Sequence, residues 1–128
     1  MNEFDLIVIG GGSGGIASAV RAATHGARVA VIENQHLGGT CVNVGCVPKK
    51  VMWYAANIQS TLNNAADYGF SVKSSRINWA TLVSARDAYI ERLRGLYNKR
   101  FDGLNITTIP GFGTLSAPNQ VTVKDKTY

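Results

Sequence analysis

Long apolar runs are missing from this sequence of 128 residues. Its longest aliphatic stretch, Leu6 to Ile9, is far shorter than the roughly 20 apolar residues that a membrane span requires. The stretch also follows the acidic residues Glu3 and Asp5, whereas a secretory leader begins with basic residues and has a longer apolar core. We therefore expect no membrane association and a cytoplasmic location.

Internal repeats and low-complexity tracts are also missing. Hydrophobic residues make up 45% of the sequence, charged residues 16%, and there are 14 glycines, which is a globular composition enriched in glycine. A chain of 128 residues forms one domain at most and is small for a complete cofactor enzyme.

Acidic residues are fewer than basic ones, 8 against 13, so the net charge is +5. Several basic residues cluster near one another: Arg92, Arg94, Lys99 and Arg100. No nucleic-acid-binding motif accompanies them, so we interpret them as the solvated face of an amphipathic helix and expect no nucleic-acid partner. A milder alternative is that their positive field attracts anionic substrates.

The first third of the sequence predicts a β-α-β unit. Residues Phe4 to Ile9 are largely aliphatic and end in glycines, which predicts a buried parallel strand. Small residues from Ser13 to about Thr24 predict a helix that stops at Gly26, and Arg28 to Glu33 predicts a second strand. The sequence therefore predicts an α/β fold with a Rossmann-like unit.

The glycines of residues 10–15 have the spacing G-x-G-x-x-G between the first strand and the first helix. Gly10 permits the tight turn, Gly12 lets the backbone approach a pyrophosphate, and Gly15 lets the helix pack against the strand. The start of the helix then offers free N–H groups and the positive end of its dipole to phosphates. The hydroxyl of Ser13 can add a hydrogen bond.

Glu33 ends the second predicted strand, 18 residues after Gly15. A carboxylate there can accept hydrogen bonds from both hydroxyls of an adenosine ribose and repels a 2′-phosphate, so the site suits FAD or NAD and disfavours NADP. The alternative is an ordinary exposed glutamate at the end of a strand. The glycines in register favour the nucleotide site.

Only two cysteines are present, Cys41 and Cys46. A disulfide between them would close a short loop and remove only about 2 kcal/mol of unfolded-chain entropy, so it would be a weak staple. Redox chemistry fits better, because two thiols at bridging distance store two electrons and a helix start near Cys46 favours its thiolate. Buried structural thiols and a regulatory disulfide remain alternatives. Zinc would need further ligands, and neither His25 nor His36 has a suitable spacing, so we predict no metal.

The middle of the sequence predicts a loop over residues 34–40 and two helices. The first has Pro48 in its opening turn and runs to about Leu62, before a turn at residues 67–69. The second starts at the N-cap Asn78. Its apolar residues recur at three- and four-residue spacing: Trp79, Leu82, Val83, Ile90, Leu93 and Tyr97.

The end of the sequence predicts the start of a β-meander. Strands are expected at residues 106–109 and 121–123, on either side of a glycine-rich turn at residues 111–113. A hairpin partner is expected after residue 123.

These features together resemble the flavoprotein disulfide reductases, the pyridine nucleotide-disulfide oxidoreductase family. The glycine loop, Glu33 and the segment Gly38-Gly39-Thr40-Cys41-Val42-Asn43-Val44-Gly45-Cys46-Val47-Pro48-Lys49-Lys50 match that family in order and spacing. The likeness covers essentially the whole chain.

Within that family the sequence is most similar to the glutathione-reducing members, on the segments Ile16-Ala17-Ser18, Pro48-Lys49-Lys50 and Val51-Met52-Trp53. Small, neutral Ala17 leaves room for anionic glutathione, where trypanothione reductases tend to have an acidic residue. Val20 stands where some glutathione reductases have arginine, which removes one contact to a substrate carboxylate.

The resemblance implies an FAD whose isoalloxazine ring lies beside a Cys41–Cys46 disulfide. Cys46 would face the flavin as a thiolate, Cys41 would be the thiol that attacks the substrate, and Lys49 would assist electron flow from NADPH. The implied FAD contacts are Gly10, Gly12, Ser13, Gly14, Gly15, Glu33, Thr40, Cys41, Lys49 and Gly113. Ser13 and Tyr97 would contact the substrate, glutathione disulfide.

By this resemblance residues 1–128 are the N-terminal part of the FAD-binding domain in a flavoprotein with two dinucleotide-binding domains. The intact protein would be a homodimer that reduces glutathione disulfide with NADPH, and these residues alone would be inactive. One alternative is a thioredoxin reductase or another disulfide reductase of the same family. A second, of a different class, is a non-catalytic dinucleotide-binding or redox-sensing module.

Overall fold

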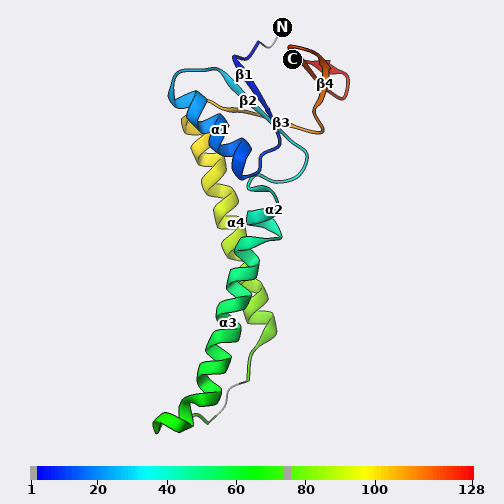
Figure 1. The fold of residues 1–128 in the computed structure, drawn as a ribbon. Helices are drawn as coiled ribbons and strands as arrows, with labels where there is room; N and C mark the ends of the chain where they lie inside the picture. The colour runs from blue at the N-terminus through cyan, green and yellow to red at the C-terminus, as the bar shows by residue number, and fades with distance from the viewer. Residues whose placement is uncertain (1–2, 74–75) are drawn as a thin grey trace.

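The computed structural model describes residues 3–73 and 76–128. A small parallel sheet and its helices form one end of the molecule, and two long antiparallel helices extend from it as an arm (Figure 1). The elements in order are β1 (Leu6–Ile9), α1 (Ser13–Thr24), β2 (Val29–Glu33), α2 (Gly39–Asn43), α3 (Cys46–Asn64), the 3₁₀ helix η1 (Ala65–Tyr68), α4 (Trp79–Gly103), β3 (Thr107–Pro110), β4 (Thr114–Ala117), β5 (Gln120–Val123) and β6 (Lys126–Thr127).

The predicted β-α-β unit is confirmed. β1 and β3 pair in parallel on either side of β2, and helix α1 occupies the predicted residues. Gly26 follows α1 with φ of +88°, a left-handed conformation that glycine adopts freely and that ends the helix. The prediction that the first strand is buried is wrong: β1 lies at the edge of the three-stranded sheet, and Ile9 is 48% exposed.

Both faces of β2 are covered, because successive side chains of a strand point to opposite faces. Val29 and Val31 pack into a first core cluster with Ile16 of α1 and Phe101 of α4. The second cluster lies on the other face of β2 and consists of Ala30, Ile32, Ile109, Val121 and Val123. The sheet is therefore a middle layer, with α1 and the end of α4 on one side and the β4–β6 meander on the other.

The β-meander expected at the end of the sequence is present. β4, β5 and β6 form a separate antiparallel sheet in that order. The expected partner of β5 is the two-residue strand β6, which follows a turn at Lys124 with φ of +54°. The strand β4 was not predicted, because its polar–apolar alternation extends over only four residues, Thr-Leu-Ser-Ala.

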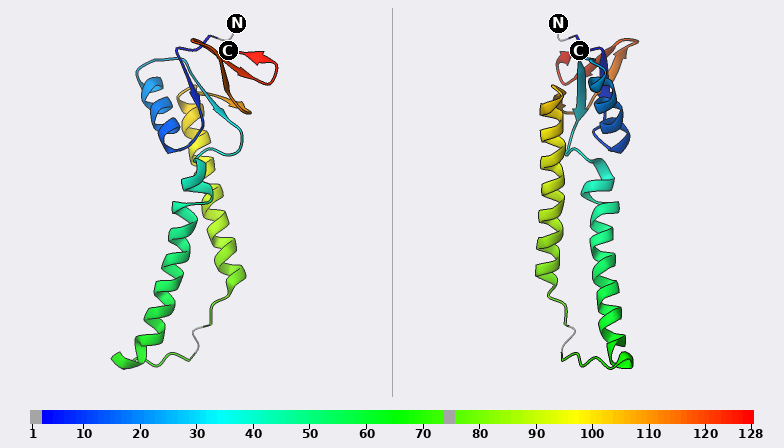
Figure 2. Two further views of the ribbon diagram at one scale, coloured as in Figure 1. Left: turned by 45° about the vertical axis from the view of Figure 1, so that its right-hand side comes forward. Right: turned by 90° about the vertical axis from the view of Figure 1, so that its left-hand side faces the viewer.

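Helices α3 and α4 form the arm and lie side by side in both views of Figure 2. As predicted, Pro48 lies in the first turn of α3, and Oδ1 of Asn78 caps α4 by accepting a hydrogen bond from the Thr81 N–H at 3.1 Å. The predicted turn at residues 67–69 is the end of η1, which stops at Gly69 in the left-handed conformation. The apolar spacing of α4 buries side chains in the middle of the helix and at its sheet end, where Ile90 and Phe101 lie, whereas Trp79 at the far end is 58% exposed.

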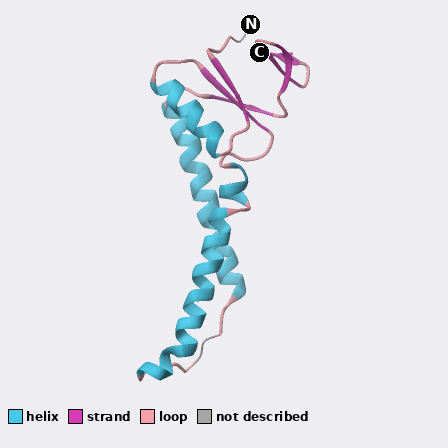
Figure 3. Ribbon diagram, in the orientation of Figure 1, coloured by secondary structure: helices cyan, strands magenta, loops and turns pink. Residues whose placement is uncertain are grey.

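The sequence did not predict helix α2. Residues 34–40 were expected to form a loop, but α2 begins at Gly39, as Figure 3 shows. The conformation depends on Gly38 and Gly39, with φ of +102° and +58°, so local residue preferences alone do not indicate a helix. Across residues 3–73 and 76–128, no helix is long and apolar enough to cross a membrane.

Candidate functional site

The first part of the site is the glycine loop between β1 and α1. Gly10 has φ of +100°, and its N–H donates to the carbonyl of Ile32 at 2.8 Å, which ties the loop to β2. A Cβ on Gly15 would collide with the carbonyl oxygen of Gly10. Gly10 therefore makes the turn and Gly15 permits close packing of α1, as the spacing predicted.

The remaining glycines of the pattern leave space open. A Cβ built on Gly12 or Gly14 has no atom within 4 Å. Gly12 is the N-cap of α1 and supplies no side-chain cap, so the first N–H groups of the helix keep their capacity to bind an anion. Ser13 and Gly14 are exposed beside them. This open helix start fits a pyrophosphate, which extra Cβ atoms would displace.

Glu33 is fixed beside the glycine loop at the carboxyl end of β2. Its Oε2 accepts a hydrogen bond from the Gly11 N–H at 2.7 Å, and its Oε1 accepts one from the Gln35 N–H at 2.8 Å. Each carboxylate oxygen keeps a second lone pair, so the side chain can still accept hydrogen bonds from a ligand. The alternative of an ordinary exposed glutamate does not fit, because Glu33 is only partly exposed and held in place by these two bonds.

Gly11 belongs to the candidate site, although the glycine spacing did not single it out. It is buried, and a Cβ on it would lie 2.6 Å from Leu37 Cδ2 and 3.2 Å from Glu33 Oε2. A side chain at this position would push the carboxylate away from the loop. The available signal was the run of three consecutive glycines, whose middle member, Gly11, occupies a variable position of the G-x-G-x-x-G pattern.

Gly113 lies at the same edge of the sheet. A Cβ on Gly113 would lie 3.2 Å from Ile32, which precedes Glu33, and 3.3 Å from Ile9, which precedes the glycine loop. The turn that leads to Gly113 is held by the Gly111 N–H, which donates to the carbonyl of Glu33 at 3.0 Å. The structure thus brings Gly113, Glu33 and the glycine loop together at the carboxyl ends of parallel strands, where open α/β sheets bind ligands.

The cysteine segment packs directly on the glycine loop. The Gly38 N–H donates to the carbonyl of Gly11 at 2.8 Å, and a Cβ on Gly39 would lie 2.8 Å from the Cα of Gly12. Only glycines allow the two backbones to approach so closely. Helix α2 therefore starts in contact with the predicted phosphate cradle.

Cys41 and Cys46 lie on two different helices that meet at a tight turn. Cys41 is in α2 and partly exposed, and Cys46 is the first residue of α3 and exposed. A Cβ on the intervening Gly45 would lie 2.8 Å from the Thr40 carbonyl oxygen and 3.3 Å from the Cα of Cys41. Neither cysteine is in a disulfide in this structure.

A hydrogen bond with the Cys46 side chain raises the pKa of the Cys41 thiol above its ordinary value, with further contributions from desolvation and from the charge of Cys46. The backbone N–H of Cys46 acts in the opposite direction on that pKa. The Cys41 thiol therefore keeps its proton to a higher pH than an ordinary cysteine does.

The other predicted site residues lie around this pair. Thr40 precedes Cys41 and is exposed, and Lys49 is exposed on α3 one turn after Cys46. Tyr97 of α4 is partly buried, and its side chain packs against the first core cluster. Its predicted contact with substrate stays a prediction.

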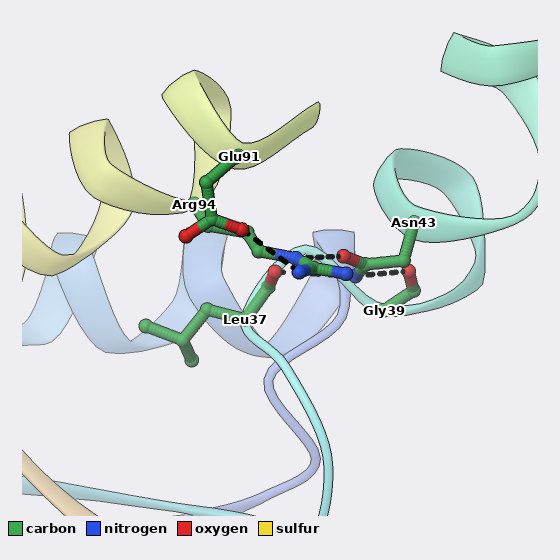
Figure 4. Close-up of polar contacts among 5 residues, drawn as sticks. All are labelled: Leu37, Gly39, Asn43, Glu91 and Arg94. Atoms are coloured by element: carbon green, nitrogen blue, oxygen red, sulfur yellow. Dashed lines mark hydrogen bonds and ion pairs between the residues drawn. The ribbon is translucent and has the colours of Figure 1, made fainter. Parts of the chain in front are cut away.

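The basic residues of α4 divide into two kinds. Arg92, Lys99 and Arg100 are exposed, as predicted for a solvated face. The prediction is wrong for Arg94, whose side chain is 25% exposed and whose Nε donates to Oδ1 of Asn43 at 2.6 Å (Figure 4). The missed signal is the spacing of residues 90, 94, 97 and 101, which places Arg94 on the buried stripe of α4.

Comparison with known proteins identifies the family. The family model of the pyridine nucleotide-disulphide oxidoreductases matches residues 4–128. The chain belongs to this family. A curated relative, the glutathione reductase of Debaryomyces hansenii, is 45% identical over 126 residues, which cover 93% of this chain and 26% of the relative. The chain thus spans about a quarter of the length of that relative.

Membership of the pyridine nucleotide-disulphide oxidoreductases agrees with the Rossmann-like geometry of the sheet end. Among residues 3–73 and 76–128, no group of three or more His, Cys, Asp or Glu side chains could hold a metal ion. The candidate site is the glycine loop with the two thiols of the cysteine segment packed beside it.

Proposed function

We propose that this chain holds FAD beside a redox-active pair, Cys41 and Cys46, in an enzyme that reduces glutathione disulfide with NADPH. The observation that carries the proposal is the packing of the cysteine segment on the glycine loop, through Gly38 and Gly39. A nucleotide on α1 and a thiol pair on α2 and α3 would be neighbours in that arrangement. The family and the printed name of the relative support the same chemistry.

The residues at the sheet edge divide the binding of FAD between them. The start of α1, with Gly12, Ser13 and Gly14, would bind the pyrophosphate through N–H groups and a hydroxyl. Glu33 would accept hydrogen bonds from the adenosine ribose, and the backbone at Gly113 would approach the adenine. When bound, FAD supplies the transfer of two electrons from NADPH to the disulfide. Lys49 would lie beside the flavin ring.

The reduced cysteines then act in two exchange steps. The Cys41 thiolate attacks one sulfur of glutathione disulfide, so a Cys41–glutathione disulfide forms and one glutathione thiolate leaves. The Cys46 thiolate attacks the Cys41 sulfur next, which reforms the Cys41–Cys46 disulfide and releases the second glutathione. The pair loses two electrons and two protons, and the two glutathione molecules gain them.

The raised pKa of Cys41 is consistent with this division of roles. A hydrogen bond with the Cys46 side chain raises the pKa of Cys41, and Cys46 is the first residue of α3, where the positive end of the helix dipole lies. We assign the flavin side of the pair to Cys46, as the resemblance to the family implies. Cys41 becomes the nucleophile when its proton is removed.

Glutathione disulfide is the proposed substrate because of the charge of this chain and the small size of Ala17. The net charge of +5 and the neutral Ala17 suit an anionic peptide. Ser13 is exposed at the glycine loop, where a substrate near Cys41 could reach it. The substrate role of Tyr97, a homodimer and a cytoplasmic location stay predictions.

The decisive experiment is anaerobic reduction of the intact protein with NADPH, followed by absorption spectroscopy. We expect a long-wavelength band from a thiolate beside the flavin, which is absent in the Cys46→Ser variant and retained in the Cys41→Ser variant. Steady-state turnover with glutathione disulfide should be lost in both. Absence of the band from the wild-type protein, or turnover with oxidised thioredoxin and none with glutathione disulfide, would contradict the proposal.

A second variant tests the cradle separately from the thiols. In Gly12→Ala the added methyl group lies in space that is open in the structure, so the fold should tolerate it. It would occupy the place proposed for the pyrophosphate. We expect normal thermal unfolding and at least tenfold weaker FAD binding, on the order of 1.4 kcal/mol. Unchanged FAD affinity would place the cofactor elsewhere.

A further inference from the structure

A polar network joins the arm to the cysteine segment. Arg94 of α4 donates from Nε to Oδ1 of Asn43, the last residue of α2, at 2.6 Å, and these side chains are drawn in Figure 4. This contact joins residues that are 51 positions apart in the sequence. It is partly buried, so solvent competes with it less than with a surface pair.

The nitrogen of the Asn43 amide forms hydrogen bonds with the backbone around α2. Its Nδ2 donates to the carbonyl of Gly39 at 2.8 Å and to that of Leu37 at 3.3 Å. Reversing the amide would place its NH₂ against the guanidinium of Arg94 and its oxygen against two carbonyls, so the network permits one orientation. Arg94 thereby orients the group that holds both ends of α2.

Helix α2 depends on such contacts because it is only five residues long. A helix of this length has almost no stability of its own. The bond that starts it is long, with 3.4 Å between the Val42 nitrogen and the Gly38 oxygen. Its position is set by Gly38 on the glycine loop at one end and by Asn43 with Arg94 at the other.

Cys41 lies on α2 between these two attachments, while Cys46 belongs to the long helix α3. We propose that Arg94 is a positioning residue for the thiol pair: through Asn43, it holds α2 so that Cys41 stays beside Cys46 across the tight turn at Gly45. This inference rests on the proposed redox role of the pair. Its chemical consequence is that Arg94 favours the disulfide over the open dithiol.

Arg94 acts here through a hydrogen bond and not through its charge. Its Nη1 also forms an ion pair with Glu91 at 3.0 Å, which offsets much of the positive charge. Glutamine at this position has a nitrogen the same number of bonds from the backbone as the Nε of arginine. Arg94→Gln therefore keeps the donor to Asn43 and removes the charge.

The test measures how easily the pair forms its disulfide in the intact protein. Incubation with oxidised and reduced dithiothreitol sets the equilibrium: two thiols of the protein lose two protons and two electrons and form one S–S bond, and oxidised dithiothreitol becomes the dithiol. Trapping with a thiol alkylator and mass spectrometry then gives the fraction of each form. Arg94→Ala should lower the equilibrium constant for disulfide formation roughly fivefold.

Three variants accompany Arg94→Ala. Arg94→Gln should remain within roughly twofold of wild type, since its hydrogen bond survives. Asn43→Ala should lower the constant at least as much as Arg94→Ala, and adding Arg94→Ala to it should have no further effect. Arg92→Ala is the matched control, because Arg92 is an exposed arginine of the same helix and should leave the equilibrium unchanged.

The outcomes separate this inference from the proposed function. A wild-type protein that forms no reversible Cys41–Cys46 disulfide would overturn the redox function itself. A wild-type equilibrium that Arg94→Ala leaves unchanged would overturn the positioning role alone, even if thermal stability falls. An Arg94→Gln variant as impaired as Arg94→Ala would also overturn it, since the effect would then come from charge.

Discussion

The parallel sheet and the helical arm bury their side chains to very different extents. In β2, the four residues from Val29 to Ile32 are at most 1% exposed. All 19 residues of α3 are described, and none of them is buried. Large apolar side chains of the arm remain accessible, such as Trp53 at 54% and Ile58 at 61%.

The difference follows from the number of neighbours that each element has. Strand β2 has a strand on each edge and a core cluster on each face, whereas the main neighbours of α3 are the helices α2, α4 and η1. Burial of apolar surface therefore stabilises the sheet end. The arm depends more on local helix features and should open more readily. The cysteine pair lies where the two regions join.

The largest difference in stability is expected between substitutions at the two ends of α4. Phe101 is 1% exposed in the first core cluster, so Phe101→Ala should lower the free energy of unfolding by about 3–5 kcal/mol. Trp79→Ala, at the 58% exposed end of the same helix, should cost less than about 1 kcal/mol. Urea unfolding measures both. Equal losses would show that the arm is packed as tightly as the sheet end.

Two glycines sharpen the comparison. Gly15→Ala forces a methyl group into the carbonyl of Gly10 and should cost about 2–3 kcal/mol. Gly95→Ala, within α4, meets no atom within 4 Å and should stabilise the helix by about 0.5–1 kcal/mol. Thermal unfolding gives both values. A neutral Gly15→Ala would mean that the loop can shift away from α1.

A smaller effect is expected at the far end of the arm. Asn78→Ala removes the cap of α4 and should cost about 1 kcal/mol. Because the arm can open by itself, faster hydrogen exchange should be confined to the first turns of α4. Faster exchange in β2 as well would show that the arm and the sheet unfold as one unit.

The smallest effect on stability is expected for a substitution in the cysteine pair, where the two regions join. It should nevertheless change the reactivity of Cys41 clearly. The pKa of Cys41 is raised by Cys46, so Cys41 holds less thiolate than an ordinary cysteine at a given pH. Cys46→Ala removes that cause, lowers the pKa of Cys41 towards its ordinary value and increases its thiolate fraction. Iodoacetamide should therefore alkylate Cys41 faster in the variant at mildly alkaline pH. A slower reaction would reverse the assigned direction.

The sequence predicted those parts of the fold whose signals are local. The strand–glycine–helix order gave β1, α1 and β2, and Asn78 marked the start of α4. It did not predict α2, because that helix depends on left-handed glycines and on contacts with residues far along the chain. The exposure of Arg94 was predicted wrongly for a related reason. Its charge alone favours a solvent-exposed position, and only its place on the buried stripe of α4 indicates a hydrogen-bond partner.

The candidate site divides in the same way. The glycine spacing, Glu33 and the two cysteines predict a nucleotide cradle and a redox pair, because each uses a residue type at a spacing that few other purposes require. Tertiary structure decided that Gly11 and Gly38 bring the predicted cradle and the cysteines into contact, that Asn43 turns towards Arg94, and that the pKa of Cys41 is raised by Cys46. These depend on distances between segments that are remote in sequence, which packing sets.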